Sequence, residues 1–346
     1  MNKKSKKDMS FWEMFLFFLG LYQPEEPQTP VDPVDPVDPV DPVDEEDSSS
    51  SSESESSDDL EEQDGQEESE STDDSENNEE ISHMKRALCI GINNYKGTSN
   101  DLNGCVNDAN NWAKLLKNKY YFDEVTIILD KEATIERVTE EMQILADKSK
   151  DGDIAVNTYS GHGSNIPDRT PIDEADGRDE TLYLYDGHLT DDVLRNIFNS
   201  YKKDAKVTFI SDSCHSGTNT RAFYAEIEGD EVAKQPTPRY MPPKDDDVAK
   251  KINELPLGAR IGAPEEDMNE ILISGCLSSE YSYDAYINGK PTGAMSHFAI
   301  KILKENLKIT YNDFYTKLRE KLPTSRYSQT PQLEGSEANK NSIMFE

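Results

Sequence analysis

Two short segments carry the side chains best suited to nucleophilic chemistry, "YSGHGS" (159–164) and "SDSCHSG" (211–217). The first contains His162 between two glycines, and the second contains Cys214. A cysteine thiol becomes a strong nucleophile when it loses its proton, and a nearby imidazole can accept that proton. A cysteine in such a segment can equally be a metal ligand or a small buried side chain. The elements that position these residues therefore decide between the alternatives.

Apolar runs and helical repeats alternate along the chain after residue 84. Runs that predict buried strands lie at 86–92, 124–130, 153–160, 206–213 and 270–276. Helical spacing of apolar residues is present in 104–118, after Thr134, after Thr190, in 294–305 and after Thr310. This alternation predicts an α/β fold with a mostly parallel sheet and helices on both faces. Residues 217–268, rich in proline and charge, predict a long loop, and 331–335 a short last strand.

The ends of three predicted strands place the reactive residues together. His162 follows the third strand, Cys214 follows the fourth, and the polar segment 274–284 follows the fifth. In open α/β sheets, ligands bind beyond the carboxyl ends of the strands. The backbone N–H groups of Gly163 and Cys214 are then suitable for an oxyanion hole. His215 points away from the neighbouring thiol if the chain is extended there, so it is not the expected base.

The acidic residues are unevenly distributed. The net charge is −34, and residues 1–84 contain 27 of the 70 acidic residues but only 4 of the 36 basic ones. That region also has a Pro-Val-Asp repeat and a serine tract, a composition that predicts disorder. Residues 85–346 are enough for one large core. The acidic balance argues against nucleic acid as a partner.

An apolar segment at 11–22 and the four cysteines bear on localisation. The segment follows a basic start, but Glu13 interrupts it and it is too short to span a bilayer as a helix. A secretory signal, a membrane-surface anchor, a docking or autoinhibitory helix and a simple apolar patch remain open. The cysteines are widely spaced, which argues against disulfides and zinc. They are Cys89, Cys105, Cys214 and Cys276. We expect a cytoplasmic protein, with a secreted or membrane-associated one as the alternative.

The motifs together resemble the caspase-like cysteine peptidases, most closely the metacaspases and their bacterial relatives, the orthocaspases. The matching segments are "ALCIGINNY", "LNGCVNDANN", "YSGHGS", "DGRDETLYLYD", "SDSCHSG" and "LISGC", over about residues 85–335. The resemblance implies a caspase-like three-layer sandwich in which His162 is the general base and Cys214 the nucleophile. The chain lacks a Q-A-C-R-G segment around Cys214, which argues against cleavage after aspartate.

The same resemblance implies a pocket for a basic side chain. Asp212 and Asp108 match the carboxylates that line the specificity pocket, with Cys105 and Ser160 nearby. Two carboxylates away from water attract arginine or lysine and repel acidic side chains. Without the resemblance, Asp108 would be interpreted as a solvated residue on its helix.

Calcium activation is a further implication of the resemblance, although the chemistry itself needs no cofactor. The matching carboxylates are Asp179, Asp191 and Asp192. Hard oxygen ligands suit calcium, but an acidic first helical turn is also favourable without any metal. Arg221 stands where a further acidic ligand is expected, so Glu226 or Glu228 would have to replace it.

The long loop at 217–268 lies where the family separates its two catalytic parts. Its basic residues are Arg221, Lys234, Arg239, Lys244, Lys250, Lys251 and Arg260. A peptidase that cuts after arginine or lysine is expected to cut itself there.

Three readings of the function compete. The first is an endopeptidase, expected to be a monomer, acting on polypeptides after arginine or lysine, and the second is a catalytically weak homologue acting as a binding module. The third is another cysteine peptidase of this broad fold, legumain-like or gingipain-like, with a different preference. Membrane contact through 11–22 is a minor alternative.

Overall fold

The computed structural model describes residues 83–167, 178–214, 235–243 and 268–346. Within them, six strands form one sheet in the order β12-β9-β7-β3-β1-β2. Five strands are parallel, and β12 pairs antiparallel with β9. The strands are Lys85–Gly91 (β1), Glu124–Leu129 (β2), Ile154–Ser160 (β3), Lys206–Asp212 (β7), Glu270–Ser274 (β9) and Gln332–Glu334 (β12).

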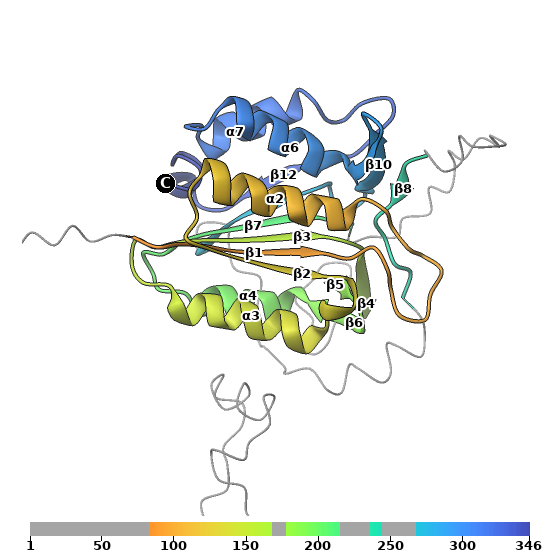
Figure 1. Ribbon diagram of the computed structural model, residues 1–346, viewed down its shortest axis with the longest axis horizontal. Helices are drawn as coiled ribbons and strands as arrows, with labels where there is room; N and C mark the ends of the chain where they lie inside the picture. The colour runs from red at the N-terminus through yellow and green to blue at the C-terminus, as the bar shows by residue number, and fades with distance from the viewer. Residues whose placement is uncertain (1–82, 168–177, 215–234, 244–267) are drawn as a thin grey trace, which may run out of the picture. The chain divides into compact units, whose positions relative to one another are not determined.

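Helices cover both faces of this sheet (Figure 1). One face carries α2 (Cys105–Lys119), α6 (Ala294–Glu305) and α7 (Tyr311–Arg319). The other carries α3 (Ile135–Lys148) and α4 (Asp191–Ser200). A 3₁₀ turn, η1 (Asp130–Glu132), precedes α3, and a short helix, α8 (Glu337–Lys340), follows β12. The predicted α/β fold with a mostly parallel sheet between two helical layers is confirmed.

Threonine side chains begin three of the helices. Thr134, Thr190 and Thr310 each have extended backbone, and each hydroxyl accepts a hydrogen bond from the N–H three residues later. Such caps satisfy backbone donors that have no partner within the helix, and each contributes about 1 kcal/mol. These helix starts agree with the ones expected from the sequence.

Two small antiparallel sheets lie near the carboxyl ends of the parallel strands, and the sequence did not predict them. One contains β4 (Gly163–Pro167), β5 (Arg178–Leu184) and β6 (Gly187–Thr190). The other contains β8 (Thr237–Pro238), β10 (Tyr283–Ile287) and β11 (Lys290–Gly293). Their strands are two to seven residues long and partly polar, so their apolar patterns are weak.

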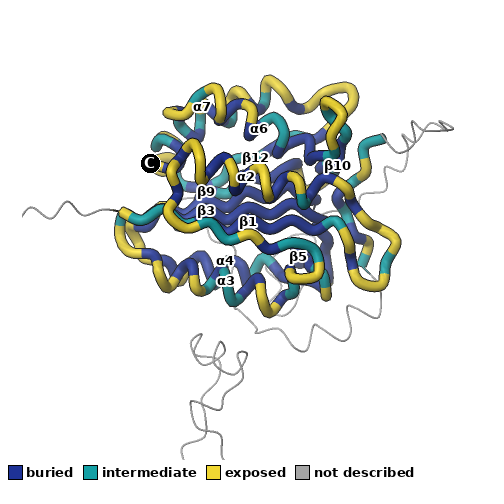
Figure 2. The backbone as a smooth tube through the Cα atoms, viewed as in Figure 1, coloured by how far each residue is buried: buried dark blue, intermediate teal, exposed yellow. Residues whose placement is uncertain are grey.

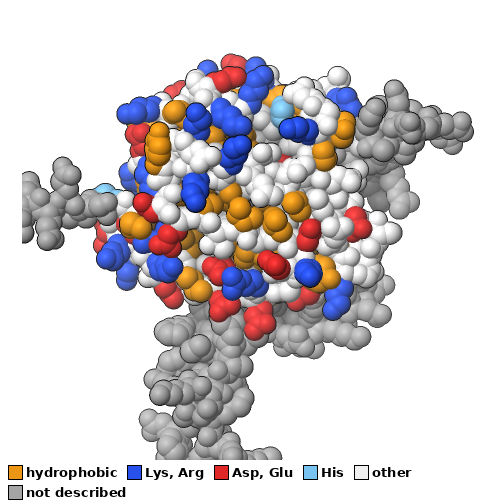
Figure 3. Space-filling model, in the orientation of Figure 1, with side chains coloured by type: hydrophobic (Ala, Val, Ile, Leu, Met, Phe, Trp, Pro, Cys, Tyr) orange, Lys and Arg blue, Asp and Glu red, His pale blue; other side chains and the backbone are white. Residues whose placement is uncertain are grey.

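The core lies along the central strands, as the dark tube in Figure 2 shows. Every residue of β3 is buried, as expected for a strand covered on both faces. At the outer edge, β2 is less well covered, and Ile127 is 39 % exposed. Figure 3 shows apolar side chains gathered over this edge of the sheet, with lysine and arginine side chains over the helices above it.

The predicted loop at 217–268 lies mostly outside the described residues. Its described part, 235–243, contains strand β8 and two fully buried side chains, those of Arg239 and Met241. This segment is therefore a packed part of the domain. The acidic region at 1–84, apart from its last two residues, and the apolar segment at 11–22 lie outside the described residues.

Candidate active site

The register of two neighbouring strands brings the histidine and the cysteine to the same place. Ser160 at the end of β3 pairs with Asp212 at the end of β7. His162 and Cys214 each lie two residues beyond this pair. Both are buried, with exposed fractions of 1 % and 0 %.

The imidazole of His162 is fixed through one of its nitrogens. Its Nε2 lies 2.7 Å from the carbonyl oxygen of Asn100, so Nε2 carries the proton and donates it. Its Nδ1 has no hydrogen-bond partner among the described residues. Burial lowers the pKa of His162 to about 4, because the charged form loses its hydration. A neutral imidazole with a vacant Nδ1 lone pair is therefore available to accept a proton.

The thiol of Cys214 lies against the backbone of Ser282. The Ser282 N–H donates to Sγ over 2.7 Å, and Sγ lies 3.2 Å from the Ser282 carbonyl oxygen, to which it donates. Neither ring nitrogen of His162 hydrogen-bonds the thiol, since Nε2 contacts Asn100 and Nδ1 has no partner in the described part of the chain.

Two backbone N–H groups converge on one carbonyl oxygen. Gly163 and Cys214 donate to the carbonyl of Arg239 over 2.9 and 3.2 Å. A Cβ atom at Gly163 would lie 1.8 Å from the Cys214 carbonyl oxygen, so only glycine allows the two segments to approach this closely. Converging N–H groups of this kind are suited to an oxyanion hole, and here the backbone carbonyl of Arg239 accepts from both.

The side chain of Arg239 enters a pocket of three carboxylates. Its exposed fraction is 0 %. Its guanidinium lies 2.6 Å from Asp108, 3.1 Å from Asp212 and 3.2 Å from Asp284. It also donates to the backbone carbonyl of Asp212 over 3.0 Å. The planar guanidinium presents five N–H donors, so it can serve several acceptors at once.

Each carboxylate of this acidic pocket is held by further donors. The donors are Thr292 and Gly293 for Asp108, Ser282 and Ser296 for Asp212, and Asn103 and Gly104 for Asp284. Four of the six are backbone N–H groups, which cannot rotate away. Gly293 is required here because a Cβ atom would lie 2.1 Å from a carboxylate oxygen of Asp212. The pocket is thus preorganised for a cation.

Burial and charge oppose each other in this pocket. Burial raises the pKa of Asp108 to about 6, although the nearby guanidinium of Arg239 counteracts the rise. Burial alone would lower the pKa of Arg239, but the surrounding acidic groups, led by Asp212, raise it instead. A buried cation is stable only where such partners compensate for its lost hydration.

The structure brings most of the predicted pocket residues together. Asp108 and Asp212 contact the guanidinium directly. Cys105 is fully buried close to them, and burial raises the pKa of its thiol, while the charge of Arg239 counteracts the rise. Ser160 lies beside Asp212 in the strand register.

Several site residues were not predicted. The sequence indicated only that 274–284 is a polar segment at a strand end, and spacing alone does not single out Ser282 or Asp284 within it. Asn100 acts through its backbone carbonyl, for which no side-chain pattern exists.

The carboxylates proposed for calcium are not gathered in the same way. No group of three or more His, Cys, Asp or Glu side chains suited to a metal ion is present within residues 83–167, 178–214, 235–243 and 268–346. Asp191 forms an ion pair with Arg195 over 3.7 Å. Asp179 is 4 % exposed on β5, and Asp192 lies in the first turn of α4. The described residues therefore do not by themselves fit a calcium ion.

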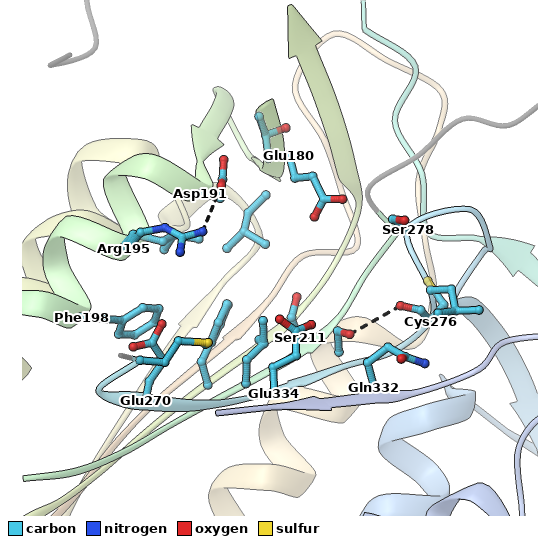
Figure 4. Close-up of a pocket in the computed structure, with 18 residues that line it drawn as sticks. Glu180, Asp191, Arg195, Phe198, Ser211, Glu270, Cys276, Ser278, Gln332 and Glu334 are labelled. Atoms are coloured by element: carbon cyan, nitrogen blue, oxygen red, sulfur yellow. Dashed lines mark hydrogen bonds and ion pairs between the residues drawn. The ribbon is translucent and has the colours of Figure 1, made fainter. Parts of the chain in front are cut away.

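A separate cavity of about 440 Å³ lies between α4 and the sheet. Figure 4 shows Asp191 and Arg195 facing each other at its rim, with Glu180, Glu270 and Glu334 also lining it. None of the acidic pocket's carboxylates lines this cavity. The acidic pocket itself is filled by Arg239.

Comparisons with known proteins place this chain in a family. Residues 84–342 match the Caspase domain family. Metacaspase-1 of Scheffersomyces stipitis is 32 % identical over 301 residues, which cover 76 % of this chain and 73 % of the relative. Metacaspase-1 of Meyerozyma guilliermondii is 33 % identical over 305 residues, covering 76 % and 72 %. The crystal structure of protein GSU0716 from Geobacter sulfurreducens has a TM-score of 0.60 and 28 % identity, covering 76 % of this chain and 98 % of that one.

The chain therefore belongs to the caspase-domain family, with metacaspases among its relatives. Membership supports a cysteine peptidase that acts on polypeptides. Among the described residues, no helix has the length and apolar character needed to cross a bilayer.

Proposed function

We propose that this chain is a cysteine endopeptidase that uses His162 and Cys214 and cuts peptide bonds after arginine or lysine. The observation that carries the proposal is the placement of Arg239. Its side chain fills the acidic pocket while its carbonyl oxygen accepts from the two N–H groups at Gly163 and Cys214. A substrate arginine in this position would present its carbonyl carbon to the thiol and its side chain to the carboxylates.

The extended path of the residues before Arg239 also supports the proposal. β8 pairs antiparallel with β10, with Pro238 opposite Tyr283. The N–H of Arg239 donates to the carbonyl of Ser282 over 2.9 Å. An extended peptide that adds a strand to β10 gains main-chain hydrogen bonds irrespective of its side chains. The acidic pocket then supplies the selectivity.

In the proposed first step, Nδ1 of His162 accepts the thiol proton, and Sγ of Cys214 attacks the carbonyl carbon. The carbonyl oxygen becomes an oxyanion stabilised by the two N–H groups. The C–N bond then breaks as His162 returns its proton to the leaving nitrogen. Nδ1 has this role because Nε2 is engaged with Asn100. The product is a thioester on Cys214 and a free amine.

The second step reverses the roles. Water enters where the amine has left, and His162 accepts its proton as the water oxygen attacks the thioester carbon. The C–S bond breaks, His162 returns the proton to the departing sulfur, and the peptide leaves with its new carboxyl group. No metal takes part in either step as proposed.

Arginine should be preferred to lysine. The guanidinium of Arg239 reaches all three carboxylates and the carbonyl of Asp212. A lysine ammonium has three donors at one point and cannot span the same acceptors. Each lost charge-assisted bond costs about 1.5 kcal/mol or more. We expect kcat/KM to be about tenfold higher for arginine than for lysine.

The placement of Arg239 also supports a proposal for the bond cut in self-cleavage. Of the seven basic residues in the loop at 217–268, only Arg239 is among the described residues. The Arg239–Tyr240 bond is the one that would break when the oxyanion hole binds the Arg239 carbonyl. Self-cleavage there would give a fragment that begins at Tyr240.

N-terminal sequencing of the fragments tests this bond. Wild type should yield Tyr240, Cys214→Ala only the full-length chain, and Arg239→Lys the same fragment more slowly. Arg137→Ala, an exposed arginine on α3, is the matched control. A different N-terminus, or the same cut in Cys214→Ala, would contradict the assignment.

Short fluorogenic peptides test the proposed activity itself. We expect hydrolysis of coumarin amides ending in arginine or lysine and none ending in aspartate. His162→Ala should lose at least about a hundredfold in kcat/KM, while His297→Ala, a partly exposed histidine on α6, should not. Hydrolysis no faster than that by Cys214→Ala would favour the catalytically weak binding module. Preference for another side chain would favour the hypothesis of a legumain-like or gingipain-like peptidase.

Calcium activation remains part of the proposal, although the described residues do not complete a site. Asp179, Asp191 and Asp192 would need ligands from residues outside the described ranges. A calcium titration of the coumarin assay, with a chelator as the starting point, tests it. If the rate of hydrolysis were the same in chelator and in millimolar calcium, calcium would not be an activator.

A further inference from the structure

The chain that follows Arg239 continues along the site in a fixed path. Tyr240 forms a parallel bridge with Gly163. The Met241 N–H donates to the Gly163 carbonyl over 2.9 Å, and the Ser164 hydroxyl donates to the Met241 carbonyl over 2.7 Å. Both backbone polar groups of Met241 are therefore paired with the start of β4. A substrate held in this way would be aligned on both sides of the cut bond.

The side chain of Met241 is buried in this arrangement. Its exposed fraction is 1 %, and its sulfur accepts from the Asn100 side-chain amide over 3.4 Å. The same residue, Asn100, receives the Nε2–H of His162 through its backbone carbonyl. The position that contacts Met241 is thus part of the loop that orients the base.

The neighbouring positions are less enclosed. Tyr240 is only partly buried, and its phenol hydrogen-bonds the side chain of Asn165. Its ring centroid lies 6.2 Å from that of Tyr281. Pro242 is exposed. Of the three residues after the bond, Met241 alone has a fully buried side chain, so selectivity is expected at that position.

We propose that the active site contains a subsite for an unbranched apolar side chain two residues after the cleaved bond, built from the start of β4 and Asn100. This inference rests on the proposed peptidase activity and narrows its substrates to those with methionine or a similar residue there. Methionine suits an irregular apolar site because it is flexible and polarizable. A carboxylate at this position would lose its hydration, and the single neutral donor of the Asn100 amide would compensate for only part of that loss.

Binding energy from this subsite should also speed the chemistry. Contacts remote from the cut bond can position the carbonyl against the thiol and the oxyanion donors. Substrates that end at the arginine, such as coumarin amides, lack these contacts. They should be cut more slowly than peptides that extend beyond the bond.

Quenched fluorescent peptides with the sequence of residues 236–243 provide the test. The set contains the parent peptide, one with norleucine for methionine, and one with aspartate for methionine. Norleucine keeps the shape and loses only the weak contact to sulfur, so we expect kcat/KM within about threefold of the parent. Aspartate should lower kcat/KM by at least about tenfold. Equal rates for the methionine and aspartate peptides would overturn the inference. The burial of Met241 would then follow only from its position two residues after the bound Arg239.

A variant of the enzyme gives a second measurement. In Ser164→Ala, the ratio of kcat/KM for the parent peptide to that for an arginine coumarin amide should fall about fivefold, because only the peptide reaches this hydroxyl. The ratio corrects for any general damage to the site. An unchanged ratio would contradict the subsite. Absence of hydrolysis of both the parent peptide and the arginine coumarin amide by wild type would instead count against the proposed peptidase activity, so the two failures are distinguishable.

Discussion

Two groups of carboxylates in this domain differ in what surrounds them. Asp108, Asp212 and Asp284 come from three different segments and meet at one buried guanidinium, each held by fixed donors. Asp191 and Asp192 lie in the first turn of α4, where Asp191 forms an ion pair over 3.7 Å with Arg195 of the same helix. Residue type is the same, but burial and preorganised donors make the first group a cation pocket. The second group reads as an acidic helix start.

The largest expected effect comes from removing a charge in the acidic pocket. Asp108→Asn or Asp212→Asn leaves Arg239, or a substrate arginine, facing one fewer buried carboxylate. Breaking such a pair costs about 3 kcal/mol or more, so kcat/KM for arginine coumarin amides should fall at least about a hundredfold. Asp151→Asn, an exposed aspartate in a turn, is the matched control. If kcat/KM fell by less than threefold, the pocket carboxylates would not differ in function from those at the start of α4.

A smaller loss is expected at the third pocket carboxylate. Asp284 lies 3.2 Å from the guanidinium, against 2.6 Å for Asp108, and it also fixes the backbone of Asn103 and Gly104. We expect Asp284→Asn to lower kcat/KM about tenfold for arginine and less for lysine, which reaches fewer acceptors. Kinetics on paired arginine and lysine amides measure both. Equal losses for the two substrates would show that Asp284 supports the pocket without contacting the substrate.

The acidic pocket should also make cleavage depend on pH, with a loss of activity at low pH. Burial raises the pKa of Asp108 to about 6, and the groups that face it are Arg239, Asp212 and Asp284. Above that pH the carboxylate is charged and attracts the cation, and below it the attraction is lost. Cleavage after arginine should therefore fall as pH decreases through about 6. Since the pKa of His162 is lowered to about 4, the base stays neutral over this range. If Asp108→Asn lost activity over the same pH range as wild type, protonation of Asp108 would not be the cause.

The smallest effect is expected at the start of α4. Asp191→Asn removes an ion pair to Arg195 with both side chains about one-third exposed. Such pairs contribute about 0.5 kcal/mol or less. Urea unfolding should show a correspondingly small loss in the free energy of unfolding. A loss above about 2 kcal/mol would mean that this region is organised like the acidic pocket.

The sequence predicted the parts of the site that depend on local pattern. Apolar runs located the parallel strands, and their ends placed His162 and Cys214 together. The pocket carboxylates Asp108 and Asp212 came from family resemblance, since a helical aspartate has no local sign of burial. Asp284 was not predicted because a hairpin returns it to the pocket from a segment rich in similar polar residues. Arg239 was assigned to a loop because prolines and charged residues surround it in the sequence. Its contact with Asp108 joins residues 131 positions apart, and no local pattern predicts such a contact.

We expect the preorganised acidic pocket to select a cationic side chain immediately before the cleaved bond. The most direct measurement compares kcat/KM for two coumarin amides that differ only in having arginine or citrulline at that position. Citrulline keeps nearly the same shape without the charge, so the account predicts at least about a hundredfold preference for arginine. Rates within threefold of each other would contradict it.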